Sequence, residues 1–224
     1  MTDEHPASKL YDDSHRALQA EFDTVRLADV MEAGIVTSVL GVEQQDFIGS
    51  RDFFFLSTLD ASGWPTVSYK GGPTGVVQVI DESTLAFPIY DGNGMFLSAG
   101  NVEAQAKIGL LFIDLETPHR LRVHATASLV RDEELMDRFP SALLVVKATV
   151  ENVFVNCARY IHKHERVADS PYIPDEAGAQ PHPSWKRIDL MQPFLPESDA
   201  GRTSDAGGPI TAVEYHQHLD EGTS

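Results

Sequence analysis

Two arginines, Arg120 and Arg122, have the residue type and spacing that most directly suggest a binding chemistry. They stand two apart in the stretch 120–130, where apolar and polar residues alternate. Alternate residues of a strand point to the same face, so both guanidiniums are expected on one side of a sheet, about 6.5 Å apart. That spacing could clamp one phosphate group. The alternative is a pair of solvent-facing arginines on an exposed sheet face.

A second candidate anion site follows from the loop Asp91-Gly92-Asn93-Gly94, which precedes a stretch, 95–105, able to form a short helix. Backbone N–H groups at such a helix start could bind an anion, and Ser98 and Asn101 on the helix could contact the ligand or cap it. The alternative for the loop is a plain turn. Lys70, at the end of an extended stretch, could stabilise negative charge or could guard a sheet edge.

Histidine and cysteine support weaker hypotheses. His162 and His164 stand two apart, but the stretch 156–164 has a helical pattern that would splay the two rings, so we predict no metal site. Cys157 is the one cysteine, which excludes an intramolecular disulfide. It is predicted to be a buried structural thiol. No residue stands out as a general base, so the catalytic residues remain unassigned.

The composition narrows the class of protein. The chain has 17 basic and 34 acidic residues among 224, a formal charge of −17. This field repels nucleic-acid phosphates and anionic lipid head groups, so neither nucleic acid nor a membrane is expected as a partner. The polar N-terminus lacks an apolar signal segment, and no apolar run approaches the ~18 residues that span a bilayer. A cytoplasmic location is therefore expected.

The order of the expected elements predicts a β-barrel with peripheral helices, an α+β fold in which the sheet is closed or split. A helix in two pieces is expected over 12–36. Strands are expected over 53–59, 64–70, 76–80, 84–87, 107–114, 120–130 and 142–154, and further helices over 95–105, 131–139, 156–164 and 211–219.

Several segments together resemble the pyridoxamine 5′-phosphate oxidase-like family of FMN-binding split barrels. Trp64-Pro65-Thr66-Val67-Ser68-Tyr69-Lys70-Gly71-Gly72 resembles the strand that cradles the flavin. The other matching segments are Leu85-Ala86-Phe87-Pro88, Asp91-Gly92-Asn93, Gly100-Asn101-Val102, Lys107 to Asp114, Arg120 to Val123, Asn156 to Ile161 and Pro183 to Lys186. Their order along residues 46–186 carries the resemblance.

The resemblance implies a six-stranded, Greek-key split barrel and a homodimer with one FMN per subunit at the interface. Lys70 matches a flavin-contacting lysine, and the backbone of Thr66, Val67 and Ser68 would face the ring. Trp185 could close the cleft or could tether the tail. The residues expected at the cofactor are Thr66, Val67, Ser68, Lys70, Asp91, Asn93, Ser98, Asn101, Arg120, Arg122 and Trp185.

The sequence departs from the vitamin-salvage members of the family at the phosphate. Pro65 stands where they have an arginine, and their Arg–Lys pair is replaced by the neighbourhood of Asn93 to Ser98. A different branch is therefore predicted: an FMN-dependent oxidoreductase that passes hydride or electrons through flavin N5 to a small-molecule redox substrate. The alternatives are a non-catalytic flavin carrier or sensor, or the same barrel binding haem or a deazaflavin. Haem would require His119 or His124 at the cleft, and a deazaflavin a wider basic groove.

Four parts of the chain are expected. Residues 1–45 form a helical segment that packs on the barrel, and residues 46–165 form the FMN-binding barrel. Residues 166–196 form an extension near the cleft, and residues 197–224 an acidic, flexible tail.

Overall fold

The computed structural model describes residues 8–222 of the chain. They belong to two compact units, Met1–Val167 and Ala168–Ser224. No helix in the described residues is long and apolar enough to cross a membrane.

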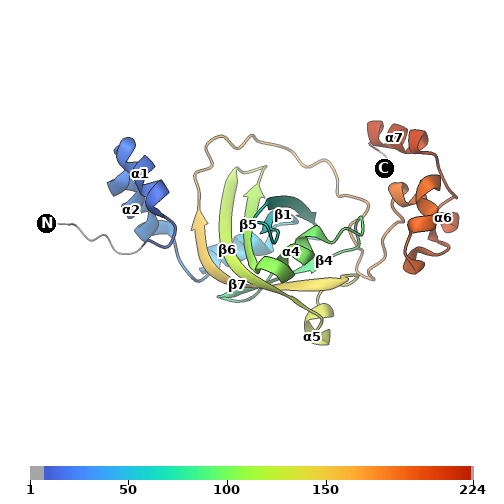
Figure 1. Cartoon of the computed structure of the whole chain (residues 1–224), viewed down its shortest axis with the longest axis horizontal. Coiled ribbons are helices and arrows are strands. Elements are labelled where there is room, and N and C mark those ends of the chain that lie inside the picture. Colours follow the sequence, from blue (N-terminus) through green and yellow to red (C-terminus); the bar gives the residue numbers. More distant parts are fainter. Residues whose placement is uncertain (1–7, 223–224) are drawn as a thin grey trace. The chain divides into compact units, whose positions relative to one another are not determined.

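A single antiparallel sheet dominates the first unit, with strand order β2-β1-β5-β6-β7-β4-β3 (Figure 1). Its strands are β1 (Phe53–Leu59), β2 (Pro65–Gly71), β3 (Gln78–Asp81), β4 (Thr84–Ile89), β5 (Lys107–Asp114), β6 (His119–Val130) and β7 (Leu144–Val155). Every strand expected from the sequence is present, and the predicted α+β class is confirmed. The sheet has seven strands where the resemblance implied six.

Aromatic contacts show that this sheet curls around one core. The ring of Phe54 on β1 lies 5.1 Å from that of Phe87 on β4, although β5, β6 and β7 separate these strands in the sheet. Phe54 also lies 5.7 Å from Phe112 on β5, and all three rings are fully buried. Strands at nearly opposite ends of the sheet therefore face each other across a shared interior, as in a barrel.

The alternation in β6 assigns its two faces as the sequence predicts. Leu121 and Val123 are almost completely buried in the core, so Arg120 and Arg122 point to the outer face. The pairing with β7 shifts at His124, where one extra residue of β7 forms a β-bulge.

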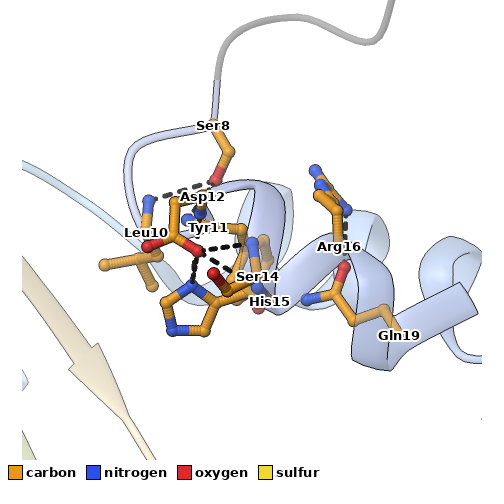
Figure 2. Close-up of polar contacts among 8 residues, drawn as sticks. All are labelled: Ser8, Leu10, Tyr11, Asp12, Ser14, His15, Arg16 and Gln19. Carbon is orange, nitrogen blue, oxygen red and sulfur yellow. Dashed lines mark hydrogen bonds and ion pairs between the residues drawn. The ribbon is translucent and has the colours of Figure 1, made fainter.

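The expected two-piece helix is confirmed as α1 (Asp13–Glu21) and α2 (Val25–Ile35). The Asp12 carboxylate caps α1 by accepting hydrogen bonds from the backbone N–H groups of Ser14 and His15, at 2.9 and 3.1 Å (Figure 2). Arg16 joins the two helices through an ion pair with Asp29 at 2.7 Å. Neither helix contains a buried residue, and packing of this segment on the barrel stays a prediction.

The described part of the first unit contains three further helices: α3 (Val42–Gly49), α4 (Leu97–Gln105) and α5 (Glu133–Met136). The sequence predicted the last two, and α3 was missed. Ile48 anchors α3 in the core, and α4 packs against β1 and β6. These contacts hold the first turn of α4 close to the sheet, where the site described below lies.

The helix predicted over 156–164 is wrong, because this segment has no helix. Its ends are bound to the barrel instead. The side-chain carbonyl of Asn156 accepts a hydrogen bond from Arg122 at 2.8 Å, and the backbone N–H of His164 donates to the Leu115 carbonyl at 2.9 Å. These tertiary bonds hold an irregular conformation against the local helical preference.

The second unit contains short helices and one bridge between Ile188 and Ile210. The predicted helix over 211–219 is confirmed as α7 (Ala212–Asp220), with Thr211 and Glu214 as its capping box. The segment expected to be a flexible tail from Glu197 onward contains η3 (Glu197–Asp199), α6 (Arg202–Asp205) and α7. The helices are η1 (Ser184–Arg187), η2 (Asp189–Phe194), η3 (Glu197–Asp199), α6 (Arg202–Asp205) and α7 (Ala212–Asp220).

Candidate functional site

A cavity of about 340 Å³ lies between β2, the end of β4 and the start of α4. Four of the residues predicted at the cofactor line it, namely Ser68, Lys70, Asn93 and Ser98. The volume falls within the ~300–1,000 Å³ of typical small-molecule sites. The sequence therefore located a strand and a helix start that the fold brings together.

Strand β2 presents Ser68 and Lys70 on its core-side face. In the register with β1 they lie opposite Leu56 and Phe54, which are fully buried. After the strand, Gly72 allows the chain to turn tightly. A Cβ atom there would lie 2.5 Å from Val76 Cγ2, so no larger residue fits without a shift.

Lys70 supplies a positive charge to the cavity. Burial lowers the pKa of its ammonium below 10.5, and no described carboxylate forms an ion pair with it. Tyr90 also lines the cavity, and burial raises the pKa of its phenol above 10.0. The cavity therefore contains the Lys70 amine and the protonated Tyr90 hydroxyl, both able to donate hydrogen bonds.

The first turn of α4 faces the same cavity. Phe96 precedes the helix in a left-handed conformation, and no side chain caps the first turn. The Ser98 and Ser68 hydroxyl oxygens lie 3.2 Å apart, which joins helix to strand. The preceding loop is ordered by the Asn93 side chain, which accepts a hydrogen bond from the Met95 N–H at 3.1 Å. Uncapped N–H groups beside Lys70 make this end of the cavity suited to an anion.

Asn101 has a structural contact within the barrel. Its side-chain amide donates to the Thr58 hydroxyl of β1 at 2.9 Å, and both residues are buried. Thr66 lies opposite Thr58 on the neighbouring strand, while Val67 points to the outer face and is exposed. Asp91 is exposed in the loop and does not line the cavity. Asn101 thus positions α4, and hence Ser98.

The remaining predicted residues lie elsewhere. Arg120 and Arg122 are on the outer face of the sheet, the face opposite to that of Ser68 and Lys70. Trp185 belongs to the second unit, where its ring lies 5.7 Å from the Lys186 ammonium. Its role at the cleft stays a prediction.

The alternatives based on histidine find little support in this cavity. No histidine lines it: His119 packs against Phe47, and His124 packs against Phe154 on the other face. Within residues 8–222 no group of three or more His, Cys, Asp or Glu side chains could hold a metal. The prediction of a buried thiol is wrong, because Cys157 is exposed in the irregular segment that replaces the expected helix.

The sequence did not single out Tyr90 and Phe96, which also line the cavity. Tyr90 stands between the end of β4 and the glycine-containing loop, a position that could have indicated it. Phe96 carries no such signal, since its left-handed conformation depends on how the loop enters α4.

The family model described as pyridoxamine 5′-phosphate oxidase matches residues 40–175 of the chain. The chain belongs to this family, and its seven-stranded sheet matches the family's split barrel. No curated protein matches the chain.

Solved structures with a similar fold come from several bacteria. A proposed pyridoxamine 5′-phosphate oxidase of Lactobacillus delbrueckii is 29% identical, with 53% of this chain and 95% of that one covered and a TM-score of 0.43. An FMN-binding protein of Syntrophomonas wolfei is 12% identical, with 63% and 96% covered and a TM-score of 0.41. The haem storage protein HutZ of Vibrio cholerae is 22% identical, with 52% and 94% covered and a TM-score of 0.40.

Proposed function

We propose that this chain binds FMN in the cavity beside Lys70 and acts as a flavin oxidoreductase on a small-molecule substrate. The observation that carries the proposal is the half-buried Lys70 ammonium, which faces the uncapped start of α4 without an ion pair. An isolated cation in a partly desolvated cavity is unfavourable until an anion binds, and FMN brings a phosphate of nearly two negative charges.

The residues of the cavity fit FMN in the following way. Lys70, the Ser98 hydroxyl and the first turn of α4 would hold the phosphate, in place of the family's Arg–Lys pair. The strand Thr66-Val67-Ser68 would lie along the ring, with the Tyr90 hydroxyl as a further donor. When bound, the flavin supplies hydride or electron transfer at N5, and the chain's own residues orient it and neutralise its charge.

A homodimer is part of the proposal because the first unit leaves apolar surface uncovered. Strand β2 lies at the edge of the sheet, and its outer face exposes Val67 and Tyr69, next to Trp64. Helices α1 and α2 expose Leu18, Phe22, Leu27, Val30 and Met31. Apolar surface of this extent, adjacent to the cavity in the case of β2, supports association with a second copy.

The cavity favours FMN over the two other ligands of this barrel. Haem would need a histidine in the lining, and none of the described residues that line this cavity is a histidine. A deazaflavin would need a wider basic groove, whereas Lys70 is the one lysine or arginine of the cavity lining.

The proposal is tested by titrating the ligand-free protein with FMN and following flavin fluorescence. The matched variants are Lys70→Met and Lys147→Met, since Lys147 is an exposed lysine on β7 away from the cavity. Loss of one charge-assisted contact should weaken FMN binding about tenfold in Lys70→Met, and Lys147→Met should bind like the wild type. Equal affinity of Lys70→Met and wild type would contradict the site.

Activity is tested separately, by adding a reduced nicotinamide to the FMN-loaded protein under nitrogen. Bleaching of the flavin absorption, followed by recovery with oxygen, is expected of an oxidoreductase. A loaded protein that does not bleach with any two-electron donor would instead be a flavin carrier or sensor.

A further inference from the structure

The outer face of β6 carries two cations that the structure leaves without counter-charges. Arg120 and Arg122 alternate with the buried Leu121 and Val123 and are themselves only partly exposed. Arg122 donates to the side-chain carbonyl of Asn156 at 2.8 Å, a neutral acceptor. The Nε atom of Arg120 is buried and has no hydrogen-bond partner. No described carboxylate pairs with either guanidinium.

This arrangement is unfavourable for the protein alone. Burial and then the charge of Arg120 lower the pKa of Arg122, so the two cations repel each other where water screens them poorly. The chain has twice as many acidic as basic residues, yet no described carboxylate forms an ion pair with these two arginines. Two adjacent, partly desolvated guanidiniums without a counter-charge are a typical recognition site for an anion.

A cavity of about 600 Å³ lies further along the same strands; its lining includes Lys107 and His124 but neither arginine. The next outward residue of β6 after Arg122 is His124, which lines the cavity about 6.7 Å further along the strand. Gly109 on β5 and Asn152 on β7 stand in register beside His124, and Ser57 on β1 stands beside Gly109. Because Gly109 has no side chain, no side chain fills the space above it between Ser57 and His124, and this space can hold a ligand.

The β-bulge shapes the far wall of this cavity. The register shift places both Glu151 and Asn152 on the cavity lining, whereas a regular strand would point one of them into the core. Glu151 accepts a hydrogen bond from Thr126 at 3.0 Å, which fixes the carboxylate at the exposed end of the cavity, away from Arg122. Burial and then the charge of Arg122 lower the pKa of His124 below 6.5, so its ring is a neutral hydrogen-bonding group at neutral pH.

We propose that this outer face is a second ligand site, for a dianionic small molecule whose anionic group binds between Arg120 and Arg122. The body of the ligand lies over Gly109, among the hydrogen-bonding side chains of the cavity. The charge of the pair matches a phosphate monoester or a dicarboxylate. The site lies on the face of the sheet opposite to Lys70 and does not require FMN to be bound.

Isothermal titration of the wild-type protein with phenyl phosphate, phthalate and inorganic phosphate tests the site. It also distinguishes a phosphate monoester from a dicarboxylate as the ligand. The charge-removing variant is Arg120→Gln with Arg122→Gln. Its matched control is Arg131→Gln with Arg138→Gln, two exposed arginines further along the chain. A third variant, Gly109→Leu, fills the floor of the cavity, and a Cβ there meets nothing closer than Ser57 Cβ at 3.7 Å.

The wild type should bind phenyl phosphate or phthalate at least about tenfold more tightly than inorganic phosphate, because the ring adds contacts in the cavity. The Arg120/Arg122 variant should lose about tenfold or more for all three anions, and the control should lose less than about twofold. Gly109→Leu should remove the advantage of the ring and leave inorganic phosphate unchanged. FMN affinity should be unaffected in every variant.

Three results would overturn the proposal. One is equal loss in the two double variants, which would indicate only a general effect of charge. Another is a parallel loss of FMN affinity in the Arg120/Arg122 variant, which would assign the arginines to the cofactor. The last is a Soret band on adding haemin that His124→Ala abolishes, which would assign the cavity to haem. Anion binding by a protein that takes up no FMN would refute the proposed function and leave this site standing.

Discussion

The hydrogen bond between Thr58 and Asn101 is expected to control both stability and the geometry of the cofactor cavity. Thr58 is 2% exposed and Asn101 8% exposed, and the 2.9 Å contact joins β1 to α4. Thr58→Val keeps the shape of the side chain and removes the acceptor, so the Asn101 amide is left buried without this partner. The expected loss in the free energy of unfolding is about 1–3 kcal/mol.

Two companion variants separate the hydrogen bond from packing. Thr58→Ser keeps the hydroxyl and removes one methyl group, at a cost of about 0.8 kcal/mol. Combining Thr58→Val with Asn101→Leu removes both polar partners, so the double variant should be more stable than the sum of the single changes predicts, by about 1 kcal/mol.

The assay is urea unfolding of the ligand-free protein, followed by circular dichroism, together with FMN titration of each variant. Ser98 stands one turn before Asn101 on α4, so a shifted helix should also weaken FMN binding in Thr58→Val about fivefold, the equivalent of one hydrogen bond. The reasoning is refuted if Thr58→Val costs no more than Thr58→Ser and the double variant is simply additive.

Three further predictions concern charged groups. FMN affinity should fall as the pH rises through the lowered pKa of Lys70, below 10.5, because the ammonium then loses its charge; Lys70→Met should abolish this pH dependence in the same titration. Asp199→Asn should destabilise the Ala168–Ser224 unit by about 3–5 kcal/mol, because the buried Lys186 ammonium, 2.8 Å from the Asp199 carboxylate, then loses its counter-charge. Faster proteolysis of this unit would show the loss. His124 has a folded-state pKa below 6.5, so the unfolded chain binds more protons and stability falls as the pH drops through 6.5. His124→Gln should make acid unfolding less steep there, and an unchanged slope would contradict the lowered pKa of this ring.

The sequence was most informative where structure depends on local pattern. The alternation of apolar and polar residues in 120–130 placed Leu121 inside and Arg122 outside, as found. The turn before α4 and the strand ending at Lys70 were also located correctly. These features depend on side-chain period and turn chemistry, which a few neighbouring residues determine.

Local pattern could not show that Lys70 and Arg122 lie on opposite faces of the sheet. Lys70 and Arg122 belong to strands separated by β1 and β5, and their faces are related only through the register of three strand pairs. The same holds for Gly109, whose significance appears only when Ser57 and His124 stand beside it. Long-range pairing is not encoded in local composition.

Local preference was misleading where tertiary contacts decide the conformation. The stretch 156–164 has helical spacing, yet the bonds of Asn156 and His164 to the barrel hold it irregular. The acidic composition after Glu197 suggested flexibility, but it does not reveal that Asp199 is buried against Lys186. A buried ion pair depends on a partner that composition cannot identify.

The most direct test of the account is the absorption spectrum of the purified protein, before and after addition of FMN and removal of the excess. The account predicts a flavin spectrum with FMN released into the supernatant on heating, and loss of most of that signal in Lys70→Met. A colourless protein that takes up no added FMN, or a Soret band in place of the flavin peaks, would contradict it.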